Sequence, residues 1–218
     1  MPKPDLVGKH SKKSEHRKRN RTVQSRIHAA AMRVFAERKL TDISVSELSQ
    51  AAGVTRATIY NNLADPDSLF ESVAAELARE MNRRVAATVK AKSDPAERLS
   101  CGIRLYVRRA HEDVLWGNFI SRFALNHASL QELWSGPPID DLREGMRQLR
   151  YSFPAEQLPS AVALIAGAVV GAISLVDQGY RGWRDAGSEA AELVLVALGI
   201  PRNEARRLAT ADLPTLEM

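Results

Sequence analysis

The chain has 218 residues, of which 44% are hydrophobic, so it is long enough for a small domain followed by a larger one. Its single cysteine, Cys101, excludes an intrachain disulfide. The formal net charge is +5, but residues 1–26 carry nine basic and two acidic side chains, which leaves the rest of the chain at −2. The basic character therefore belongs to one end of the sequence.

The first expected element is a basic arm, residues 1–21. A run this polar cannot bury enough apolar surface to fold alone, so we expect it to be disordered in isolation. Such arms neutralise phosphates, and some enter the minor groove, which makes Arg19, Arg21 and Arg26 candidate DNA contacts. A solubilising tail and a patch for anionic lipid are the alternatives. The arm lacks the apolar stretch of a secretory signal, so we expect a cytoplasmic protein.

Residues 22 to about 39 have the spacing of an amphipathic helix. One face carries Val23, Ile27, Ala30, Ala31, Val34 and Phe35. This apolar stripe can cover the open face of the segment that follows and complete a three-helix unit.

Residues 44–63 (SVSELSQAAGVTRATIYNNL) predict two short helices joined by a tight turn. Ser44 and Glu47 form a capping box, and Thr55 is a favoured N-cap for the second helix. Gly53 can adopt the left-handed conformation that the turn requires. Ile59 and Leu63 lie four residues apart and are expected to face inward.

The second helix leaves polar side chains for other contacts. Arg56 can donate two hydrogen bonds to guanine, and Asn61 could pair with adenine. Thr58 suits a phosphate or a thymine methyl, and Tyr60 could reach a phosphate. An ordinary hairpin with a solvated face is the alternative, with Tyr60 as a half-buried core aromatic. The complete set of candidate DNA contacts is Arg19, Arg21, Arg26, Ser44, Thr55, Arg56, Thr58, Tyr60, Asn61 and Asn62.

Asp65, Pro66 and Asp67 predict the start of a fourth helix, with Asp65 as N-cap and Pro66 at the first helical position. We expect this helix to run to about residue 80. The first folded domain would then be residues 22–80, and the second residues 81–218.

Residues 22 to about 77 resemble the DNA-binding domain of the TetR/AcrR family of transcriptional regulators, through the Ala-Gly-Val turn and the Thr-x-Tyr that follows it. The resemblance implies a homodimer, most often a repressor, which binds a palindromic operator and releases it when a small ligand enters the second domain. It places Arg56 and Thr58 at base-facing positions, and Tyr60 and Asn62 at phosphate or base contacts. The chain departs from the family at Pro66, where a phosphate-contacting lysine is usual, and at Leu63, where an aromatic residue is usual.

Residues 81–218 predict helices throughout, with turn signals at 93–95, 111–113, 136–138, 154, 179–187 and 199–201. No alternating strand pattern and no phosphate-binding glycine loop occurs there. We therefore expect an all-α protein.

Two segments, 161–176 and 190–200, are unusually apolar. The first is short for a membrane span and rich in Gly and Ala, so we expect no membrane insertion. A single helix-turn-helix unit contacts few base pairs, so specific binding to DNA needs two such units. The two apolar helices can form the dimer interface that brings the two units together. One large monomer core is the alternative. The candidate interface residues are Val162, Ile165, Val169, Ile173, Leu193, Val194 and Ala197.

An aromatic-rich region between these parts is a candidate effector pocket. Four side chains could anchor an anionic or aromatic ligand there, namely Arg104, Arg108, Arg122 and His127, although each is individually expected to be a solvated or ion-paired surface group. A packed core is the alternative for the aromatic residues. The candidate pocket residues are Ile103, Tyr106, Trp116, Phe119, Phe123, His127 and Trp134.

No catalytic or metal-binding spacing is present. His111 has no second histidine four residues on, and Cys101 lacks a nucleophile signature. We expect no enzyme, no cofactor and no metal. The sequence favours a ligand-responsive transcriptional regulator whose partners are a double-stranded DNA operator, a second copy of the chain and a small effector. A ligand-independent DNA-binding dimer is the alternative.

Overall fold

The computed structural model describes residues 22–35, 37, 43–63, 69–126 and 128–217. Every regular element in these ranges is a helix, which confirms the all-α prediction. The α-helices after the first one (residues 22–35) are α2 (Val45–Ala52), α3 (Arg56–Asn62), α4 (Leu69–Val89), α5 (Pro95–Glu112), α6 (Val114–Phe123), α7 (Pro137–Arg147), α8 (Leu158–Asp177), α9 (Trp183–Ala197) and α10 (Arg202–Thr210). Short 3-10 helices cover Ala128–Leu133 and Ala155–Gln157. The chain divides into two compact units after Val73, inside α4.

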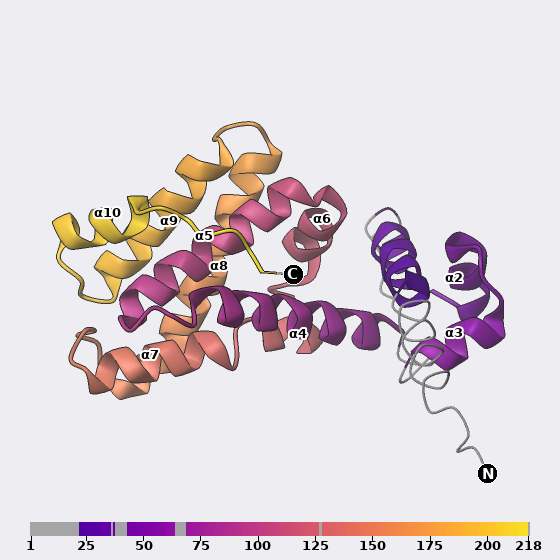
Figure 1. Cartoon of the computed structure of the whole chain (residues 1–218), viewed down its shortest axis with the longest axis horizontal. Coiled ribbons are helices and arrows are strands. Elements are labelled where there is room, and N and C mark those ends of the chain that lie inside the picture. The colour runs from indigo at the N-terminus through magenta and orange to yellow at the C-terminus, as the bar shows by residue number, and fades with distance from the viewer. Residues whose placement is uncertain (1–21, 36, 38–42, 64–68, 127, 218) are drawn as a thin grey trace, which may run out of the picture. The chain divides into compact units, whose positions relative to one another are not determined.

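The N-terminal unit contains the first helix, α2, α3 and the start of α4 (Figure 1). Ile27 and Phe35 are fully buried on the first helix, as its apolar stripe predicts, and Leu48 and Ile59 are fully buried on α2 and α3. Phe35 meets Phe70 of α4 edge to face, with ring centroids 5.0 Å apart. Burial of each such side chain stabilises the unit by roughly 1.5–3 kcal/mol.

The C-terminal unit is built around α5, which packs against α6, α7, α8, α9 and α10 (Figure 1). Several of these helices begin at positions where the sequence predicts a turn. Asp94 caps α5 by accepting a hydrogen bond from the backbone N–H of Ala96 at 2.9 Å, and Asp113 caps α6 through the N–H of Trp116 at 3.1 Å. Gly187 lies inside α9 rather than in a turn, and a Cβ added there would meet the Arg104 Cα of α5 at an ordinary 3.5 Å.

Helix α8 is strongly apolar, and Asp177 is the one charged residue in its sequence. Residues 155–177 are long and apolar enough by composition to cross a membrane, but a core helix of a soluble protein has the same composition. Only 33% of the most apolar window is buried within the chain. An apolar helix with a largely uncovered surface is a candidate for contact with another subunit.

Burial divides the predicted interface residues between the inner and outer faces of α8 and α9. Four of these residues have almost no surface to offer a partner, because they fill the core of the unit: Ile165 (4% exposed), Val169 (1%), Ile173 (3%) and Val194 (1%). The outer face instead carries Leu164, Gly167, Gly171 and Leu175 of α8 with Leu193 and Ala197 of α9. Val162 is half-buried.

Candidate nucleic-acid interface and effector cavity

The turn between α2 and α3 has the predicted geometry. The Ser44 hydroxyl accepts a hydrogen bond from the Glu47 N–H at 3.2 Å, and the Glu47 carboxylate accepts one from the Ser44 N–H at 2.9 Å. Gly53 ends α2 in the left-handed region, with φ 63°. Thr55 then caps α3 by accepting a hydrogen bond from the Thr58 N–H at 3.2 Å. These contacts fix the direction in which α3 leaves the turn.

Arg26 holds the same turn from the first helix. Its guanidinium Nη2 donates to the carbonyl oxygens of Ala52 at 2.9 Å and Gly53 at 3.3 Å. These carbonyls are at the C-terminal end of α2, where a cation is favourable. The sequence nominated Arg26 as a DNA contact, and its contacts in the protein give it a second role as a cap.

The outward side of α3 carries the polar side chains that the sequence nominated. Arg56 is exposed and donates from Nη2 to the Ser46 hydroxyl of α2 at 2.6 Å. The hydroxyls of Thr55 and Thr58 lie 2.9 Å apart, and the Asn62 amide donates to the Thr58 carbonyl at 2.8 Å. Tyr60 is 54% exposed, so it is not the core aromatic of the alternative reading.

Asn61 is also exposed on α3. Six residues singled out from the sequence lie outside the described part of the chain. Arg19 and Arg21 belong to the arm, His127 belongs to the candidate pocket, and the predicted start of the fourth helix supplies the other three, Asp65, Pro66 and Asp67.

A cavity of about 40 Å³ lies in the C-terminal unit between α4, α5, α7 and α8. Three nominated pocket residues line it, namely Ile103, Tyr106 and Trp134. One wall is a stripe of α4 consisting of Asn82, Val85, Ala86 and Val89. Further lining comes from Arg98, Leu99, Gly102, Leu133, Pro137, Pro138, Asp141, Ile165 and Val169.

Few polar groups reach the cavity, and most of them are paired. The Arg98 Nε donates to the Asp141 carboxylate at 2.6 Å. Burial raises the pKa of Asp141, against the lowering effect of the Arg98 guanidinium. The Tyr106 hydroxyl donates to the Asn82 amide oxygen at 2.9 Å, and burial raises the pKa of this phenol. The tyrosine therefore stays protonated at neutral pH.

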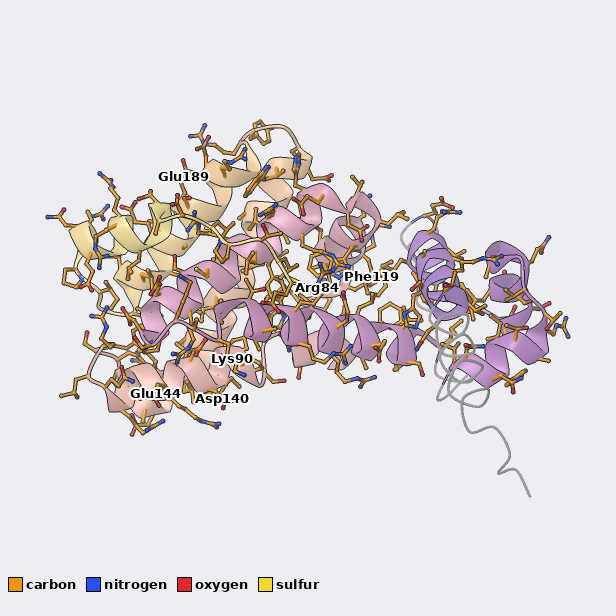
Figure 2. The ribbon with its side chains drawn as sticks, in the orientation of Figure 1. Arg84, Lys90, Phe119, Asp140, Glu144 and Glu189 are labelled. Atoms are coloured by element: carbon orange, nitrogen blue, oxygen red, sulfur yellow. The ribbon has the colours of Figure 1, made fainter. Side chains whose placement is uncertain are left out.

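Three nominated aromatics do not line the cavity. Trp116 and Phe119 are fully buried on α6 and Phe123 is nearly so, because the apolar stripe of this helix packs into the core. Figure 2 labels Phe119 on α6. Sequence reasoning missed Arg98, Asp141 and the α4 stripe as cavity residues, since they come from segments that only the fold brings together.

The three arginines considered as anchors also lie elsewhere. Arg104 is 9% exposed and does not line the cavity, and Arg108 forms an ion pair with Glu112 at 2.7 Å. Arg122 does not line it either.

A second hollow, of about 170 Å³, lies where α5, α6 and α8 meet. Its rim is polar, with His111, Asn118, Ser121 and Asp177, and its floor includes Ala110 and Ile173. Among the described residues, no group of three His, Cys, Asp or Glu side chains could hold a metal ion.

A helix-turn-helix unit with an exposed polar second helix, followed by a larger helical unit, defines a class of two-domain DNA-binding proteins. The family model described as bacterial regulatory proteins, tetR family, matches residues 27–73. The model described as tetracyclin repressor-like, C-terminal domain, matches residues 94–211. The chain belongs to the TetR family of transcriptional regulators.

Individual relatives agree with this assignment. The uncharacterized HTH-type transcriptional regulator Rv1255c of Mycobacterium tuberculosis is 28% identical over 96 residues, which are 44% of this chain and 48% of that protein. The chain thus spans about half the length of the curated relatives that it matches.

Solved structures show the same fold. RolR in complex with resorcinol has a TM-score of 0.67 and 24% identity, over 92% of this chain and 99% of RolR. FadR from Bacillus subtilis in complex with stearoyl-CoA has a TM-score of 0.59 and 18% identity, over 80% of this chain and 97% of FadR.

Proposed function

We propose that the protein is a homodimeric repressor in the cytoplasm that binds a palindromic operator through α3 and releases it when a small apolar or aromatic effector enters the α4–α8 cavity. One observation carries this proposal. Helix α4 begins within the N-terminal unit, and its later turns form a wall of the cavity in the C-terminal unit. A ligand that displaces this wall acts on the helix to which the DNA-binding unit is joined.

The DNA contacts are proposed from exposure and chemistry. Arg56 contributes the only formal positive charge between residues 44 and 63, and its guanidinium suits bidentate pairing with guanine. Its hydrogen bond to Ser46 holds the side chain close to α2 in the free protein. Thr58, Tyr60, Asn61 and Asn62 would supply the remaining contacts of α3, together with Ser44 and Thr55 at the helix ends and arginines of the arm.

The dimer is proposed to form through the outer face of α8 and α9. Leu164, Leu175 and Leu193 are 44%, 41% and 62% exposed on this face, which is costly in water unless another surface covers them. A Cβ added at Gly167 or Gly171 would meet no atom within 4 Å in the protomer. The two glycines therefore leave the outer face of α8 low enough for a second helix to approach closely.

The size of the cavity couples effector binding to movement. Apolar cavities of about 150 Å³ bind benzene, whereas this one measures about 40 Å³. An aromatic effector therefore needs its walls to separate. Effector binding shifts the dimer from one geometry to a second one only if the effector binds the second geometry more tightly. An effector that is too large for the cavity described here binds more tightly to a geometry in which the cavity is wider, so this condition is met.

The structural neighbours support a small-molecule effector without identifying it. One was crystallised with resorcinol, an aromatic diol, and another with stearoyl-CoA. The paired Arg98 and Asp141 at the cavity edge could exchange hydrogen bonds with a hydroxyl group of an aromatic ligand. The cavity favours this reading over the alternative of a ligand-independent DNA-binding dimer.

Selection of bound sequences from a random DNA pool by the full-length protein tests the DNA-binding proposal and supplies the operator. Arg56→Ala should weaken operator binding by about 1–3 kcal/mol and relax specificity at one base pair. Arg202→Ala, an exposed arginine of α10, is the matched control and should bind normally. Equal affinities of the two variants would contradict the role given to Arg56.

A cavity-filling variant tests the effector site. Gly102 lines the cavity, and a Cβ there meets Val85 at an ordinary 3.7 Å. Gly102→Leu should keep operator affinity but lose the release caused by any aromatic compound that displaces the wild type. A fully retained response would place the effector elsewhere.

A further inference from the structure

The segment that follows α10 returns to α4. Residues 211–217 have no regular secondary structure and cross the C-terminal unit, ending beside α4 (Figure 1). The backbone N–H of Glu217 donates to the Thr88 hydroxyl at 2.9 Å, and its carbonyl accepts from the Arg84 Nε at 2.6 Å. Leu216 is 8% exposed. We call residues 211–217 the strap.

The hydrogen bond from Arg84 to the C-terminal end of the strap belongs to a wider network of ion pairs. Arg84, labelled in Figure 2, also donates from Nη1 to the Glu80 carboxylate at 3.0 Å, which in turn accepts from Arg109 of α5 at 3.2 Å. Burial lowers the pKa of Arg104 on α5, and the charge of Asp212, near the start of the strap, opposes that lowering.

Strap and cavity use different sides of one stretch of α4. The cavity stripe has the spacing i, i+3, i+4, i+7 from Asn82 to Val89. Arg84 and Thr88 are four residues apart and lie on another side of the helix. An effector that pushes α4 away from α5 and α8 would therefore strain or break the contacts of the strap.

We propose that the strap holds the effector cavity closed, so that release of the strap from α4 is part of the effector response. The regulatory part of this inference rests on the proposed effector site. The restraint is small enough to be reversible, because it consists of two hydrogen bonds and one buried leucine in the described residues. Its strength would set the effector concentration at which the protein responds.

Amide hydrogen exchange on the full-length protein tests the restraint without DNA or effector. Thr88→Val removes the hydroxyl that accepts from Glu217 and preserves side-chain shape. We expect the amides of residues 82–89 to exchange roughly tenfold faster, the factor that corresponds to one ordinary hydrogen bond, while the amides of α9 keep their rates. Leu216→Asp, which detaches the strap by a different change, should give the same pattern.

The matched control is Thr210→Val in α10. Thr88 and Thr210 both donate to the carbonyl four residues earlier, at 2.7 and 2.9 Å, but of these two hydroxyls only that of Thr88 accepts a hydrogen bond from the described residues of the strap. The control should leave exchange at residues 82–89 unchanged. Unchanged rates in Thr88→Val and Leu216→Asp would overturn the proposal, and so would an equal increase in every helix, which indicates general destabilisation.

Phenol, titrated against tryptophan fluorescence, separates this proposal from the effector site itself. If phenol binds the wild type, Thr88→Val should bind it several-fold more tightly, and equal affinity would overturn the link between strap and cavity. If phenol and a panel of larger aromatics all fail to bind, the effector site is wrong. The exchange result would then still decide whether the strap restrains α4.

Discussion

Replacement of Gly171 by leucine should separate dimerisation from folding. In the protomer a Cβ added at this position meets no atom within 4 Å, and removal of a mid-helix glycine favours the helix by roughly 0.5–1 kcal/mol. In the proposed dimer the same side chain enters a close helix–helix contact. Overpacking of a well-packed contact costs about 1–3 kcal/mol.

Two-fold symmetry doubles that cost, since both subunits contribute the residue. A total of about 2–6 kcal/mol would raise the dimer dissociation constant by roughly 30-fold to 10⁴-fold. Sedimentation equilibrium over a range of concentrations measures this constant, and circular dichroism on the same samples measures helix content. We expect weaker dimers with helix content retained.

Asn203 provides the control, because Asn203→Leu adds a similar side chain at an exposed position that belongs to neither α8 nor α9. It should leave the dissociation constant unchanged. A Gly171→Leu protein that dimerises as tightly as the wild type would refute the assignment of this face, whatever its helix content.

Three further outcomes can be measured on the same protein. Deletion of residues 1–19 should reduce the dependence of operator affinity on salt while preserving sequence preference, and an unchanged slope in a binding titration would make the arm a bystander. Leu149 is 89% exposed at φ 54°, so Leu149→Gly should raise the free energy of unfolding in urea by roughly 0.5–1 kcal/mol, and a loss of stability would show that the side chain matters. Burial raises the pKa of Asp94, but hydrogen bonds from Arg150 and the Ala96 N–H outweigh it and hold the pKa below its ordinary 3.8. Its charge therefore stabilises the fold above that value and ceases to do so as pH falls through the lowered pKa. Asp94→Asn keeps the helix cap but removes the charge, so the wild type should have the larger free energy of unfolding at pH 7, and this difference should shrink below about pH 4. A difference that does not depend on pH would contradict the ion pair.

The local geometry of the helix-turn-helix unit could be predicted from sequence because short-range chemistry determines it. The capping box at Ser44, the left-handed Gly53 and the cap at Thr55 each involve residues within a few positions of one another. The Arg26 cap joins residues 26 positions apart, and no local pattern announces such a contact.

The rotation of α8 could not be predicted, which explains why the proposed interface residues include side chains that are buried within the protomer. A helix that is apolar on all sides has no polar stripe to show which face is outward. Contacts with α5 and α9 turn Ile165, Val169 and Ile173 inward. Part of the cavity lining was missed because it joins distant segments of the sequence. Arg98 and Asp141, for example, are 43 positions apart. The strap has no periodicity at all.

The small buried surface of α3 affects how regulators of this type can diverge in sequence. Of its seven residues, only Ile59 is buried. Most surface substitutions change stability by less than about 0.5 kcal/mol, so the other six positions can mutate with little effect on folding. Duplicated copies of the gene could thus acquire new target sequences by a few neutral steps in α3, while the rest of the protein and its small-molecule response stay as they were.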